Sequence, residues 1–74
     1  MLEKLIEINN SIINQTTNEQ EKEKHLLIKK ILDDKNCFLK MDIETSYALL
    51  RELNISEENI KSTYLDLIDP SNIV

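Results

Sequence analysis

The side chains best able to do chemistry are His25 and Cys37, each the single residue of its type in the chain. A cysteine–histidine catalytic pair also needs a third group that orients the imidazole and donors that stabilise an oxyanion. No pattern in the sequence nominates either, and a cysteine followed by Phe38 and Leu39 is typical of an inert, buried thiol. The sequence therefore predicts no catalytic residues and a protein that is not an enzyme.

A metal site is the second chemistry that His25 could serve, because Glu21 precedes it by four residues and would share its face of a helix. One imidazole and one carboxylate rarely hold an ion by themselves, and a single cysteine excludes a zinc motif built on cysteine pairs. The acidic segment 33–36 lacks the glycine that a calcium loop needs. We therefore expect no metal, no cofactor and a surface position for His25.

Length and charge limit the remaining classes of function. The chain has 74 residues and a net charge of −5, so we expect one small domain, residues 1–74, which nucleic acid and anionic membranes repel. No apolar stretch approaches the ~18 residues that a membrane span needs, and the first residues do not resemble a secretion signal. These features predict a cytoplasmic protein whose small core depends on good helix packing or on a partner subunit.

Apolar residues recur with helical spacing along most of the chain. The pattern predicts an all-α bundle of about four short helices, near residues 2–14, 18–33, 43–53 and 57–68. The absence of glycine supports this fold class, because glycine is the residue best suited to tight β-hairpin turns. Residues 34–41, between the second and third helices, are apolar enough to predict a short strand or a buried loop.

Caps and apolar stripes predict how the second and third helices are oriented. Thr16 or Thr17 would cap the second helix, since each has Glu or Gln three residues later to complete a capping box. The apolar residues of each helix should form its buried face. They are Leu27, Ile28, Ile31 and Leu32 in the second helix, and Ile43, Tyr47, Leu50 and Leu53 in the third.

Residues 42–70 have the spacing of a helix-turn-helix. Asn54 stands at the turn, where asparagine is the best substitute for glycine in a left-handed backbone conformation. Leu50 before it and Ile60 after it occupy the apolar positions that such a unit needs for its internal packing. We therefore expect a C-terminal αα-hairpin.

The charges of this hairpin argue against its commonest use. If the last helix entered a DNA groove, Glu57 and Glu58 at its start would meet phosphates, where lysine and arginine normally lie. The same two residues stabilise a helix N-terminus, and they could form an acidic contact face for a protein. A helix-turn-helix DNA-binding regulator that uses residues 43–68 is therefore the alternative rather than the leading hypothesis.

The leading hypothesis is a small, acidic, non-enzymatic protein that acts by binding another protein, with self-association as one form of that binding. The expected contact stripe lies on the first helix, whose apolar face is wider than one neighbour would cover. It consists of Leu2, Leu5, Ile8 and Ile12. Abundant isoleucine, asparagine and lysine, encoded by A/T-rich codons, suggest an accessory or regulatory protein of a bacterial mobile element or phage.

Asn9 is the one polar residue within this stripe. Such a residue can fix the register of two packed helices, or it can mark the place where the stripe reaches water. The sequence leaves both alternatives open.

Overall fold

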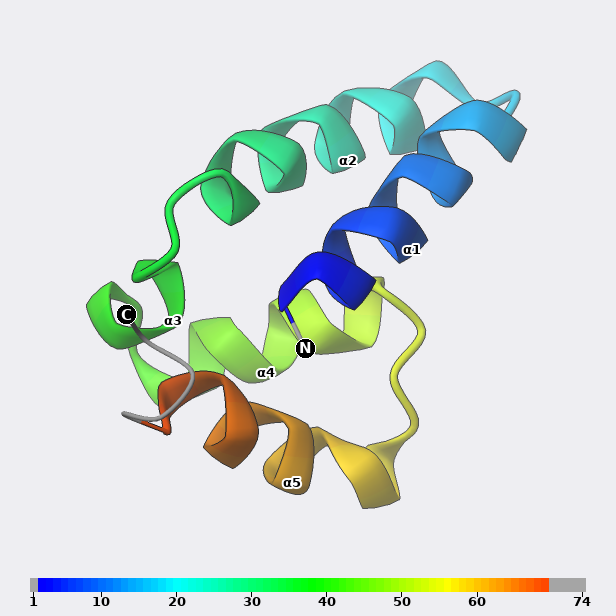
Figure 1. Ribbon diagram of the computed structural model, residues 1–74. Coiled ribbons are helices and arrows are strands. Elements are labelled where there is room, and N and C mark those ends of the chain that lie inside the picture. The colour runs from blue at the N-terminus through cyan, green and yellow to red at the C-terminus, as the bar shows by residue number, and fades with distance from the viewer. Residues whose placement is uncertain (1, 70–74) are drawn as a thin grey trace.

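Helices make up most of the part of the chain that the computed structural model describes, residues 2–69. In order they are α1 (Leu2–Gln15), α2 (Glu19–Leu32), α3 (Cys37–Lys40), α4 (Ile43–Glu52) and α5 (Glu57–Ile68), as Figure 1 shows. Residues 2–69 contain no β-strand, so the expected all-α fold is confirmed. None of the helices in this range combines the length and apolar character that a membrane span requires.

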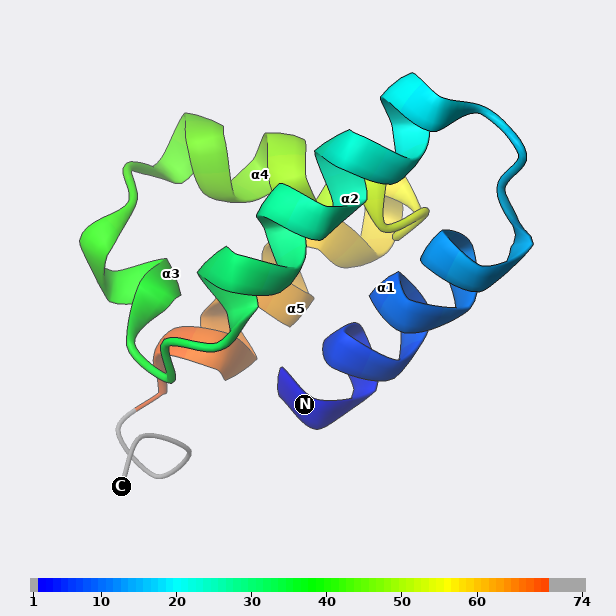
Figure 2. The ribbon, with the colours of Figure 1, turned by 90° about the horizontal axis from the view of Figure 1, so that it is seen from above.

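The helices form two stacked hairpins. α1 and α2 pack against each other in one layer, and α4 and α5 pack against each other in the second (Figure 1). α3 connects the two layers at one end and contacts α5, an arrangement that is clearest from above (Figure 2). Because α2 packs chiefly on α1, one side of α2 remains free of the second layer.

The core between the layers draws on every helix. Its most deeply buried members include Leu5 of α1, Leu32 of α2, Phe38 of α3, Leu50 of α4 and Ile60 of α5. Neither hairpin encloses this cluster alone, so burial of these side chains requires both layers. Residues 2–69 therefore share one hydrophobic core.

Residues 34–41 differ from the expected strand or loop, because they include the short helix α3. The carboxylate of Asp34 accepts a hydrogen bond from the backbone N–H of Asn36 (2.9 Å), which turns the chain after α2. The helical turn that follows places both Cys37 and Phe38 in the core. The apolar content of the segment was thus a correct sign of burial, but its backbone forms a helix.

The cap of α2 also differs from expectation. Asn18 caps this helix, and its Oδ1 accepts hydrogen bonds from the backbone N–H groups of Gln20 (2.9 Å) and Glu21 (3.2 Å). The predicted caps, Thr16 and Thr17, lie in the connection because α1 extends to Gln15. α1 is therefore one residue longer than expected, and α2 begins one residue later, at Glu19.

The predicted buried faces of α2 and α4 are partly wrong. In α2 the buried residues are His25, Ile28 and Leu32, whereas Leu27 is 61% exposed. Ile31 is exposed as well. α2 is rotated about its axis relative to the expectation, so that a histidine replaces apolar residues at the interface with α1.

In α4 the N-terminal end of the predicted stripe is on the surface. Ile43 is 57% exposed, while Ser46 and Leu49 are buried beside Leu50. The hydroxyl of Ser46 has no hydrogen-bond partner among the described residues. α4 thus buries a small polar residue where it faces the rest of the bundle, and Tyr47 is half-buried against Tyr64 of α5 in an edge-to-face contact.

The C-terminal αα-hairpin is confirmed. Asn54 has φ 64°, the left-handed conformation expected at its position. The backbone N–H of Ile55 donates to the carbonyl of Leu50 (3.1 Å), and that of Asn54 donates to the carbonyl of Arg51 (2.9 Å). These two bonds form a Schellman motif, which satisfies the last carbonyls of α4 and fixes the direction of the chain into α5.

This turn predicts the effect of two substitutions. Asn54→Ala should lower the free energy of unfolding by about 1 kcal/mol, because alanine is disfavoured in the left-handed region. Asn54→Gly should keep or raise stability, since glycine has no Cβ. Urea denaturation followed by circular dichroism measures both, and an equal loss in the two variants would show that the side chain of Asn54, not its backbone, matters.

Candidate functional site

His25 lies inside the protein, not on its surface as expected from the sequence. Its side chain is 2% exposed and sits between α1 and α2. Asn9 of α1, which is 0% exposed, is its partner. The polar residue in the stripe of α1 therefore marks a helix–helix interface and not the edge of the core.

Asn9 and His25 make two reciprocal hydrogen bonds. Nδ2 of Asn9 donates to the backbone carbonyl of His25 (3.0 Å), and Oδ1 of Asn9 lies 2.9 Å from Nδ1 of His25. The opposite orientation of the amide would put two oxygens in contact, so its oxygen must face the ring. Nδ1 must then donate the hydrogen bond, so in this tautomer Nε2 is the ring nitrogen that has the free lone pair.

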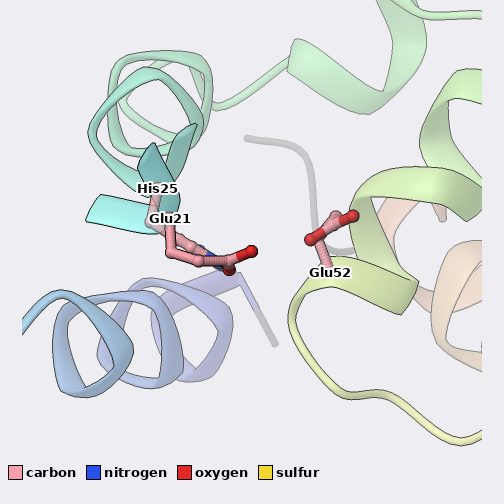
Figure 3. A group of neighbouring side chains, drawn as sticks. All are labelled: Glu21, His25 and Glu52. Carbon is pink, nitrogen blue, oxygen red and sulfur yellow. The ribbon is translucent and has the colours of Figure 1, made fainter. Parts of the chain in front are cut away.

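Nε2 of His25 points toward two carboxylates. Oε2 of Glu21, one turn earlier in α2, lies 3.8 Å from it, beyond hydrogen-bonding distance. Glu52, at the end of α4, completes a cluster in which the nitrogen and one oxygen of each carboxylate all lie within 4.8 Å of one another. Figure 3 shows the side chains of Glu21 and His25 extending from α2 toward the end of α4.

Lys24 supplies the positive charge that these carboxylates need. Its Nζ lies 2.7 Å from Oε2 of Glu52 and 3.3 Å from Oε1 of Glu21. The hydrogen bonds to Glu52 first, and to Glu21 second, raise the pKa of Lys24 above its ordinary value. The bridge from Lys24 to Glu52 links α2 with α4, and so connects the two layers at this edge of the bundle.

The donor atoms of Glu21, His25 and Glu52 are close enough together to hold a cation. A groove of about 410 Å³ lies elsewhere, between the start of α1 and α5. Its lining includes Lys4, Ile8, Asn59 and Asp66, and it contains no histidine or cysteine.

One residue of this arrangement, Asn9, has a recognisable signal in the sequence, whereas Glu52 has none. Asn9 within an apolar stripe is the one available signal, because a buried amide would need a polar partner. The sequence does not show that Asn9 is buried or that His25 is its partner. Glu52 carries no such signal, because only the stacking of the two hairpins brings it to α2.

Cys37 has the properties of a structural thiol. It is buried in α3, and burial, followed by the charge of Asp34, raises the pKa of its thiol above the ordinary value. A cysteine nucleophile needs the opposite shift, toward thiolate at neutral pH. The local environment thus supports the expectation of an inert cysteine.

The expected contact stripe on α1 faces the interior to a large extent. Leu5 is buried, while Leu2, Ile8 and Ile12 are half-buried and pack against the core. Leu5 is therefore inaccessible to a partner while the fold is intact. Of the four residues, Leu5 and Ile8 line the groove beside α5.

Glu57 and Glu58, the expected acidic face, are both exposed at the start of α5. Glu57 accepts a hydrogen bond from Nε of Arg51 at 2.6 Å, which ties α5 to the end of α4. This bond and the negative charge of Glu57 raise the pKa of Arg51. The ion pair offsets one of the two charges, so the acidic face is weaker than the sequence suggests.

The Asn9–His25 pair predicts a strong energetic coupling. Asn9→Leu and His25→Leu should each lower the free energy of unfolding by about 2–3 kcal/mol, because each leaves a buried polar group unpaired. The double variant should lose at least about 1 kcal/mol less than the sum, since both polar groups are then absent. Urea unfolding of all four proteins measures this coupling, and additive losses would contradict it.

No protein-family model matches this chain, and the comparisons with curated proteins and with solved structures found no match either. The function is therefore inferred from the chemistry and surface of the protein itself.

Proposed function

We propose that this protein is a small non-enzymatic binding module that acts through protein–protein contact, and that a second copy of the chain is the partner. The observation that supports the proposal is an exposed apolar ridge on α2, formed by Leu27 and Ile31. Large apolar side chains gathered on one exposed side of a helix are typical of interaction surfaces.

The ridge has a defined position on α2. Lys24, Leu27 and Ile31 have the spacing i, i+3, i+7, so they share one side of the helix. Lys24, at one end of this side, reaches Glu52 of α4 with its long side chain, whereas Leu27 and Ile31 are exposed. Leu26 is also exposed, but it lies about 100° further around the helix and outside the ridge.

The charge of α2 favours a copy of itself as the partner. Acidic residues occupy its first turn, Glu19 and Glu21, and basic residues occupy its last, Lys29 and Lys30. In an antiparallel pair of α2 helices, the acidic end of each faces the basic end of the other. A two-fold symmetric interface has this antiparallel arrangement when the helix crosses the axis.

Oligomeric mass tests the proposal directly. Sedimentation equilibrium should show a dimer that forms in the micromolar to millimolar range, about 1 µM to 1 mM. Replacement of both Leu27 and Ile31 by glutamine should give a monomer with an unchanged circular dichroism spectrum, because both side chains are exposed.

Leu26→Gln is the matched control, since Leu26 is exposed on the same helix but outside the ridge. It should dimerise like the original protein. A mass of 8.7 kDa, that of one chain, at ~1 mM would overturn the proposal, as would equal weakening by the ridge and control substitutions.

DNA binding by the α4–α5 hairpin is the second candidate, supported by the helix-turn-helix shape alone. Its charges oppose it, because Arg51 is paired with Glu57 and the start of α5 is acidic. A gel shift at low salt maximises electrostatic attraction to DNA. We expect no binding to mixed-sequence duplexes under these conditions, and a retarded band that is lost at higher salt would favour the DNA hypothesis instead.

A further inference from the structure

We propose that Glu21, His25 and Glu52 form a zinc site that joins α2 to α4. The ligands would be Nε2 of His25 and one carboxylate oxygen from each glutamate, with water in the fourth position. The three donor atoms already lie within 4.8 Å of one another (Figure 3). Glu21 and His25 lie one turn apart in α2, and Glu52 comes from α4 in the other layer.

The imidazole is prepared for this role by Asn9. Zinc-binding histidines usually donate a hydrogen bond from the nitrogen that does not bind the metal, which fixes the tautomer and the ring orientation. Nδ1 of His25 donates in this way to Oδ1 of Asn9, and the second hydrogen bond of Asn9 holds its amide in place. The lone pair of Nε2 therefore faces the carboxylates without any rearrangement of the core.

The distances require only small movements. Ligands at 2.0–2.2 Å around a tetrahedral ion lie about 3.4 Å from each other. Nε2 of His25 and Oε2 of Glu21 are 3.8 Å apart, close to that separation. Glu21 and Glu52 are about half exposed, so their side chains can rotate to bring the third ligand closer while the buried histidine stays fixed.

Lys24 is the competitor for this site. Its ammonium group lies between the two carboxylates, and a zinc ion would displace it. The side chain of Lys24 is 40% exposed and can swing into solvent. Two carboxylates balance the charge of a divalent ion, which makes the exchange electrostatically favourable once Lys24 leaves.

The donor set favours zinc over magnesium or calcium. Magnesium prefers six oxygen ligands and calcium six to eight, whereas one imidazole nitrogen and two carboxylates with an open position suit zinc. Because the ligands come from both layers, bound zinc should stabilise the folded state, as any ligand does that binds only the native protein.

The test is calorimetric titration of chelator-treated protein with zinc chloride, together with thermal unfolding. We expect one zinc per chain, a dissociation constant of about 1–100 µM, and an increase in Tm with zinc concentration. Magnesium chloride at the same concentrations should leave Tm unchanged.

Exposed residues supply the variants, so loss of the fold does not confuse the result. Glu52→Gln should weaken zinc binding at least about tenfold, since it removes a charged ligand. Lys24→Met should strengthen binding because it removes the competing cation. Glu23→Gln is the control: Glu23 lies in the same helix, is exposed, and is outside the cluster.

Absence of zinc binding at ~1 mM would overturn the proposal. Binding that Glu52→Gln leaves unchanged would also overturn it, because the ion would then lie at another place. If Glu52→Gln and Glu23→Gln weakened zinc binding equally, the effect would be one of general surface charge. That result would also overturn the proposal.

Discussion

The reciprocal hydrogen bonds between Asn9 and His25 are the constraint on which the arrangement of the first layer depends. Both side chains are almost completely buried, and each satisfies polar atoms of the other. A shift of α2 along or around its axis would leave an amide and an imidazole unpaired in the core. The cost of an unpaired buried group, about 1–3 kcal/mol, is large relative to the stability of so small a domain. The pair therefore sets the register of α1 against α2.

The same constraint decides which side of α2 faces solvent. Turning His25 inward brings Ile28 and Leu32 into the core with it, because these residues follow at helical spacing. Leu27 and Ile31 then lie on the exposed side, although their hydrophobicity alone would place them inside. The apolar ridge on which the proposed self-association rests is thus a consequence of the polar pair.

The pair also determines the chemistry at the edge between the layers. With Nδ1 of His25 committed to Asn9, only Nε2 is available to groups outside the α1–α2 interface. Glu21 is beside it because of helical spacing, whereas Glu52 is beside it because α4 ends there. Lys24 currently balances the two carboxylates and connects the layers. His25 therefore connects the buried hydrogen bonds to Asn9 with the exposed charges of Glu21, Lys24 and Glu52.

The sequence by itself determined the helical class, most helix positions and the αα-hairpin around Asn54. These features follow from local rules: the 3.6-residue period, the preference of asparagine for left-handed backbone, and acidic first turns. Only the tertiary structure decided that α3 is helical, that His25 is buried, and that Glu52 adjoins Glu21. Each of these depends on contacts between residues distant in sequence, which periodicity does not encode. Rotation of a helix about its axis is decided in the same way, because burial of a hydrogen-bonded polar pair can outweigh exposure of two apolar side chains.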